Sequence, residues 1–68
     1  MANLLEGLDT SAKIRGLIAA HQMTQAELGV LLNITRDTVL NHLAENRWDI
    51  KELNKIAEHF KIDTKDLI

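Results

Sequence analysis

The feature that most constrains the fold of this chain is a helix-start signal that occurs four times in 68 residues. Each time, a residue able to cap a helix has one apolar neighbour directly before it and another four residues after it, which is the spacing of a hydrophobic staple. Glu27 and Glu52, each three residues after a capping residue, complete two capping boxes. The four capping residues are Thr24, Thr35, Asp49 and Asp63. These signals predict a helix directly after each of them.

The apolar residues between the caps follow a helical period. Ile14, Leu17 and Ile18 indicate one more helix, upstream of the first cap. The chain has no proline, and no segment alternates apolar and polar residues as a half-buried strand does. The pattern therefore predicts a single all-α domain with five helices, near residues 11–21, 25–32, 36–45, 50–60 and 64–68.

The turn between the second and third of these helices contains only Asn33, Ile34 and Thr35. So short a connection makes two helices cross steeply, as in a helix-turn-helix. Asparagine is the usual substitute for glycine in the left-handed conformation that ends helices. Gly29 offers almost no side chain where the third helix must approach; the alternative is that it only weakens the second helix, by about 1 kcal/mol relative to alanine.

Composition excludes several classes of protein. The chain has no cysteine, and His21, His42 and His59 form no i, i+4 pair, so neither a disulfide nor a metal site is predicted. No nucleophile stands in a catalytic motif, and we expect no enzyme and no cofactor. The longest apolar runs are far below the roughly 20 residues of a membrane span, and no signal-peptide pattern opens the chain. A cytoplasmic protein is expected.

The net charge of −2 argues against a nucleic-acid partner, because phosphate binding usually needs a basic surface. The distribution of charge weakens that objection. Residues 1–12 carry two acidic and no basic residues, whereas residues 13–55 carry six basic and five acidic ones. Any attraction to DNA should therefore be local, and specificity should depend on shape and hydrogen bonds.

The segment TQAELGVLLNITRDTVLNHL, residues 24–43, closely resembles the helix-turn-helix of the phage-repressor family, the Cro/CI-like or XRE regulators. The upstream segment IRGLIAAHQMTQ and the downstream segment DIKELNKIAEHFKIDTKDLI are similar to the flanking helices of that family. The resemblance implies a compact five-helix DNA-binding bundle over residues 11–68, preceded by a leader of residues 1–10. It also implies a bacterial or phage-infected cell as the setting.

Several positions depart from the family pattern. Gln22 and Asn33 stand where the family usually has glycine, so both must suit the local backbone. His42 stands where the family commonly has an apolar side chain beneath its recognition helix. We expect Leu43 to take over that packing, which turns His42 toward solvent or a DNA phosphate.

The resemblance implies that the third helix enters the major groove with its first turns, which carry Arg36, Asp37 and Thr38. Arg36 is expected to donate two hydrogen bonds to guanine; the alternative is a surface ion pair with Asp37 or Glu27. Asn41, one turn further on, is expected to bind adenine or else to be merely solvated. Asp37 either accepts from cytosine N4 or rejects wrong sequences.

Four more residues are expected to contact the DNA backbone. Gln25 resembles the glutamine with which the family clamps a phosphate, at a helix N-terminus that favours anions. Thr35 is expected to bind phosphate beside its capping role. Asn46 and Arg47, in the loop after the third helix, are further candidate phosphate ligands.

The implied function is that of a sequence-specific transcriptional regulator, a repressor of phage or prophage type. A single helix-turn-helix contacts one half-site, so we expect a homodimer on an inverted repeat whose half-sites lie roughly 34 Å apart. Without a separate oligomerisation domain, the dimer should form weakly and largely on the DNA.

Surplus apolar residues suggest an alternative function. Val30 and Leu31 occupy positions where the family is usually polar, and the leader adds Leu4, Leu5 and Leu8. Either the leader folds over the second helix and covers it, or the apolar surface binds a partner. In the second case the chain is a small antirepressor or modulator of another regulator, which its net acidity slightly favours.

Overall fold

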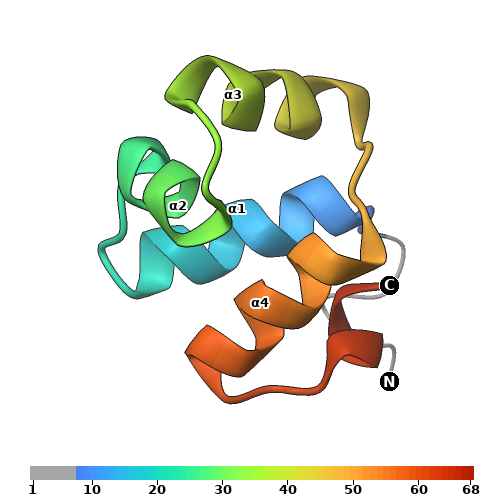
Figure 1. The fold of residues 1–68 in the computed structure, drawn as a ribbon. Helices are drawn as coiled ribbons and strands as arrows, with labels where there is room; N and C mark the ends of the chain where they lie inside the picture. The colour runs from blue at the N-terminus through green and yellow to red at the C-terminus, as the bar shows by residue number, and fades with distance from the viewer. Residues whose placement is uncertain (1–7) are drawn as a thin grey trace.

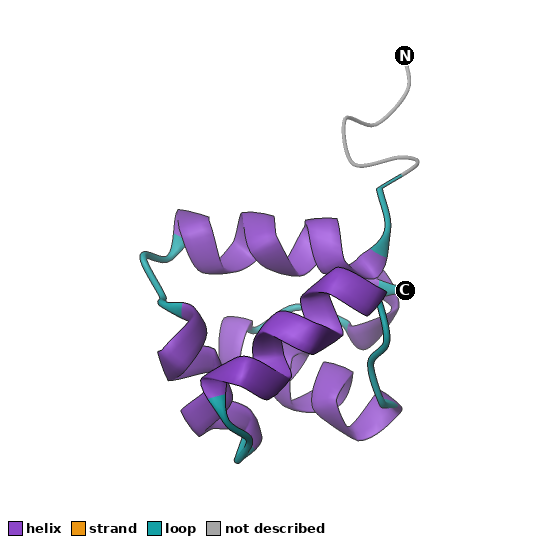
Figure 2. Ribbon diagram, turned by 90° about the horizontal axis from the view of Figure 1, so that it is seen from above, coloured by secondary structure: helices purple, strands orange, loops and turns teal. Residues whose placement is uncertain are grey.

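The computed structural model describes residues 8–68, which form four α-helices and one 3-10 helix. The elements are α1 (Thr10–Ala20), α2 (Gln25–Leu32), α3 (Arg36–Glu45), α4 (Ile50–Phe60) and η1 (Thr64–Leu67). Figure 1 shows α1 crossing the middle of the fold, with α3 above it and α4 below it. Over the described part of the chain, Figure 2 shows only helices and loops, so the all-α prediction is confirmed there.

The prediction of a fifth α-helix at residues 64–68 is wrong, because this segment forms the 3-10 helix η1. Asp66 N donates to Asp63 O at 2.9 Å, a hydrogen bond between residues three apart. The Asp63 side chain makes no capping hydrogen bond. A four-residue segment that must also bury Leu67 is too short for cooperative α-helical turns.

Side-chain caps begin the α-helices, largely where the sequence predicts. Thr24 and Glu27 form the predicted capping box of α2, with Thr24 Oγ1 accepting from Glu27 N at 3.0 Å and Glu27 Oε1 accepting from Thr24 N at 2.9 Å. Glu52 Oε1 accepts from Asp49 N at 2.9 Å at the start of α4. Asp9, which was expected to lie in the leader of residues 1–10, is the N-cap of α1. The local polar pattern therefore sets where each helix starts.

The turn between α2 and α3 has the predicted geometry. Asn33 is left-handed, with φ 60° and ψ 42°, and Gln22 before α2 also has a positive φ of 56°. Ile34 N donates to Gly29 O at 2.8 Å, and a Cβ on Gly29 would lie 2.7 Å from Ile34 O. Gly29 is therefore required by the close approach of the two chain segments.

All five elements contribute to one hydrophobic core. Leu43 is buried in it, as predicted. The buried apolar residues are Ile14, Ile18, Leu28, Leu32, Val39, Leu43, Leu53, Ile56, Ala57 and Leu67. Among residues 8–68, no helix has the length and apolar character that crossing a membrane requires.

Candidate nucleic-acid interface

The helix α3 is set in place by its cap and by its inner face. Thr35 Oγ1 accepts from Thr38 N at 3.1 Å, and the two hydroxyl oxygens lie 2.8 Å apart. Val39 and Leu43, four residues apart on one side of α3, are buried in the core. Because that side faces inward, the opposite side of α3 is exposed, and Figure 1 shows α3 at the edge of the fold.

The outer face of α3, defined here by Asp37 and Asn41, is exposed to solvent. The two side chains lie one turn apart. Arg36 is also exposed but stands at the first residue of the helix, about 140° around the axis from Asn41. The structure thus brings Asp37 and Asn41 onto one face and leaves Arg36 at the end of the helix. Thr38 is half-buried and its hydroxyl is bound to Thr35.

The alternative ion pair of Arg36 with Asp37 or Glu27 is not formed within residues 8–68. The Arg36 guanidinium is therefore unpaired in this part of the chain. An unpaired, exposed arginine at a helix start can extend all of its donors toward an external acceptor.

Gln25 is the first residue of α2 and is half-buried. The capping box uses the backbone N–H of Glu27, and the N–H groups of Gln25 and Ala26 have no acceptor among residues 8–68. Free N–H groups and the positive end of the helix dipole favour an anion at this point. The Glu27 carboxylate stands in the same turn and opposes that preference.

The hydrogen bonds of the capping box lower the pKa of Glu27 below its ordinary value of 4.5. The main cause is the Thr24 backbone N–H, which donates to the Glu27 carboxylate, and the Thr24 hydroxyl adds to it. Glu27 is consequently ionised at neutral pH and remains a fixed negative charge near Gln25. Its charge favours the start of α2 and would repel a phosphate that approaches too closely.

Asn46 and Arg47 follow the far end of α3. Asn46 has a left-handed backbone, and its Oδ1 accepts from Ser11 N at 3.0 Å. The side-chain oxygen of Asn46 is thus bound within the fold. Its side-chain nitrogen, Nδ2, is a donor and can bind a phosphate. The Arg47 side chain is 83% exposed, and its Nε lies 4.0 Å from a Glu45 carboxylate oxygen. An exposed pair at this distance holds Arg47 only weakly.

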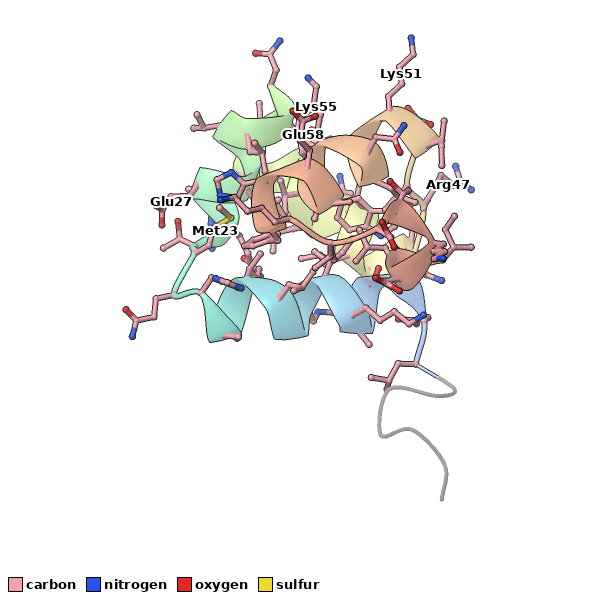
Figure 3. The ribbon with its side chains drawn as sticks, turned by 90° about the horizontal axis from the view of Figure 1, so that it is seen from below. Met23, Glu27, Arg47, Lys51, Lys55 and Glu58 are labelled. Carbon is pink, nitrogen blue, oxygen red and sulfur yellow. The ribbon has the colours of Figure 1, made fainter. Side chains whose placement is uncertain are left out.

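The charged residues around α3 are spread over the molecule. Glu27 and Arg47 lie at opposite ends of the view in Figure 3. Lys51 and Lys55 project from the exposed side of α4 and form no ion pair within residues 8–68. The candidate interface runs from Gln25, at the start of α2, to Arg47, which follows α3 in the chain.

The expectation that His42 turns toward solvent or a phosphate is wrong. His42 Nε2 lies 3.0 Å from Glu52 Oε2, and the imidazole ring meets the Trp48 ring edge-on, with centroids 5.2 Å apart. The sequence gives no sign of this pair, because the capping box already accounts for Glu52. Glu52 has two carboxylate oxygens. The capping box uses Oε1, and Oε2 is free to accept from His42.

The sequence also matches a known protein family. The profile of the Cro/C1-type HTH DNA-binding domain matches residues 13–68, which is most of the chain. The chain therefore belongs to the Cro/C1-type helix-turn-helix family, and the predicted resemblance is confirmed. It is a DNA-binding protein of a family that is typically non-enzymatic. No curated protein and no solved structure matches it.

Proposed function

We propose that this protein is a sequence-specific transcriptional repressor, of phage or prophage type, that reads operator DNA in the major groove with α3. One observation carries the proposal: Asp37 and Asn41 are exposed on the outer face of α3, and Arg36 at its start has no ion pair among residues 8–68. Polar side chains without partners in the fold are available to the edges of bases. The family membership supports the same surface.

Four residues of α3 have assigned roles in this proposal. Arg36 donates to O6 and N7 of guanine, and Asn41 pairs with adenine. Asp37 accepts from cytosine N4 or, where no cytosine stands opposite it, rejects the sequence by repulsion. Thr38 lines the groove beside Thr35. Base contacts of this kind carry the specificity of the complex.

The backbone contacts position the domain. Gln25 and the free N–H groups at the start of α2 hold one phosphate, and Thr35 holds another near the start of α3. Arg47 and the amide nitrogen of Asn46 hold the backbone at the far end of α3. A homodimer on an inverted repeat, with half-sites roughly 34 Å apart and assembled largely on the DNA, completes the proposal.

The test is selection of duplexes from a random-sequence pool by the wild-type protein, followed by affinity measurements across a salt series. Arg36→Ala should lose about 1–3 kcal/mol on the selected duplex and relax the preference at one base pair. Gln25→Ala should weaken all duplexes about equally and leave the salt dependence unchanged, because glutamine carries no charge. Arg15→Ala, which removes an exposed arginine on α1, is the matched control. It should change neither the affinity for the selected duplex nor the base preference. Selection of no sequence would refute the proposal.

One observation favours a second candidate function. Val30, on α2, is 81% exposed although it is apolar, and Leu8 is also exposed. An exposed apolar side chain suits binding of another regulator protein by a small antirepressor or modulator. The Leu4 and Leu5 contributions predicted for this surface lie outside the described residues. Val30→Ser should abolish such a complex and leave DNA affinity unchanged.

A further inference from the structure

Behind α3 lies a cluster of polar and aromatic side chains that we name the α3 latch: Ser11, His42, Trp48 and Glu52. The His42–Glu52 pair at its centre is mostly shielded from solvent, with side-chain exposures of 23% and 14%. Glu52 is a hydrogen-bond acceptor, so His42 Nε2 carries the proton in their 3.0 Å contact. The Trp48 ring packs edge-on to the imidazole at an interplanar angle of 81°.

The latch also holds the backbone of His42. Trp48 Nε1 donates to Ser11 Oγ at 3.0 Å, and Ser11 Oγ donates to His42 O at 3.4 Å. Ser11 is 1% exposed, and no buried side-chain polar atom among residues 8–68 lacks a partner. His42 is therefore held at both its ring and its carbonyl. A satisfied network of this kind specifies one arrangement of the elements that carry it.

The His42–Glu52 contact is the one side-chain hydrogen bond between α3 and α4 in residues 8–68. Glu52 is itself fixed, because its other oxygen accepts from Asp49 N at 2.9 Å at the start of α4. The apolar contacts of Val39 and Leu43 set how deeply α3 sits, but such contacts are non-directional. A hydrogen bond requires both a distance and an angle, so it also restricts rotation of α3 about its axis.

We propose that His42 is a positioning residue for DNA binding, which acts through Glu52 to set the rotation of α3 and thus the direction of Asp37 and Asn41. The inference rests on the proposed function, since it assigns α3 to the groove. His42 itself does not contact DNA. A small rotation of α3 would displace Asn41 from hydrogen-bond geometry with a base while Val39 and Leu43 remain within the core.

Two substitutions of nearly equal size and helix propensity separate this role from packing. His42→Gln retains an N–H donor toward Glu52, whereas His42→Met does not. On a duplex selected by the wild-type protein, His42→Gln should bind within about twofold of wild type and His42→Met about tenfold more weakly. Both affinities are corrected for the folded fraction, measured by circular dichroism and denaturant unfolding.

A matched control removes a different hydrogen bond. Thr64→Val deletes the 2.7 Å bond from Thr64 Oγ1 to Asn54 Oδ1, which joins η1 to α4 away from α3. It should leave the affinity of the folded protein unchanged. Equal affinities for His42→Gln and His42→Met would overturn the inference. If the wild type selects no sequence at all, it is the proposed function that fails. If the wild type selects a sequence and the two variants bind it equally, only the inference about His42 fails.

A further test of the His42–Glu52 hydrogen bond uses the wild-type protein alone. The Nε2 proton of His42 should give a slowly exchanging imidazole signal in nuclear magnetic resonance spectra of the free protein, and the signal should persist in the complex with the selected duplex. Persistence supports the latch even if His42→Met fails to fold. Disappearance of the signal on binding would mean that His42 leaves Glu52 in the complex, which overturns the inference.

Discussion

The two ends of α3 are held in place by different kinds of contact. At its start, Gly29 and Ile34 bring two backbone segments together, and Thr35 caps the helix over a span of three residues. At its far end, Ser11 binds both Asn46 and the carbonyl of His42, more than 30 residues away in the chain. The first end depends on the shape of a short turn. The second depends on polar groups that meet only in the folded protein.

This difference separates reading from positioning in the proposed complex. The start of α3 carries Arg36, which is exposed and unpaired among residues 8–68, so this end suits contact with a variable external surface. The far end carries Asn46 and His42, whose side chains have partners inside the protein. A helix that is held at both ends but exposes unpartnered side chains at its start can present them without losing its orientation.

The largest expected effect comes from breaking the turn at the start of α3. In Gly29→Ala the new Cβ would lie 2.7 Å from Ile34 O, so the backbone must shift. We expect the free energy of unfolding to fall by about 2 kcal/mol, because overpacking against backbone outweighs the better helix propensity of alanine. Urea denaturation followed by circular dichroism measures the loss.

Gly16→Ala is the matched control for this prediction. Gly16 lies inside α1, and a Cβ there would have no neighbour within 4 Å. The same substitution should therefore raise stability, by roughly 0.5–1 kcal/mol. If both variants were stabilised, the close approach of α2 and the turn would not constrain the residue at position 29.

The start of α3 could be predicted from the sequence because its contacts are local. The Thr35 cap, the left-handed Asn33 and the close approach at Gly29 each involve residues no more than a few positions apart. The capping pattern of Asp63 misled the prediction of a fifth α-helix, since the signal marks a start but says nothing about length. Helix starts follow from local chemistry, whereas the form of the last element follows from how Leu67 reaches the core.

The latch could not be predicted from the sequence, because its partners come from α1, α3, the following loop and α4. No pattern of neighbouring residues indicates that the Ser11 hydroxyl binds Trp48. Likewise, no pattern indicates that His42 binds the second carboxylate oxygen of Glu52. Asp37 and Asn41 lie on the exposed face of α3. Their contacts with bases remain predictions, since these depend on a DNA sequence that the fold does not contain.

The second largest expected effect comes from breaking the polar contacts at the far end of α3. Ser11→Ala removes the acceptor of the Trp48 indole N–H and the donor to His42 O. We expect a loss of about 1.5 kcal/mol, because the partly buried Trp48 indole N–H is left without a partner, whereas His42 O still accepts from the backbone N–H groups of Asn46 and Arg47. Trp48→Phe in the Ser11→Ala background removes the orphaned N–H.

A double-mutant cycle over Ser11 and Trp48 checks that prediction. The loss in the double variant should be smaller than the sum of the two single losses, since each single change breaks the same hydrogen bond. Additive losses would show that the two residues stabilise the fold independently. In that case the far end of α3 would be held by separate contacts and not by a network.

The smallest expected effect concerns the Glu27 capping box, which tests whether the start of the helix-turn-helix depends on charge. The folded protein lowers the pKa of Glu27 below 4.5, so the folded state binds fewer protons than the unfolded chain as the pH falls past that value. The stabilisation from Glu27 is therefore fully present above about pH 4.5 and is lost as the pH falls through the lowered pKa. Glu27→Gln keeps an acceptor for Thr24 N but cannot ionise, so its unfolding free energy should decline less than that of wild type between pH 6 and pH 3. Parallel declines in urea denaturation would mean that the charge adds nothing to this cap, and that the start of the motif is held by shape and neutral hydrogen bonds alone.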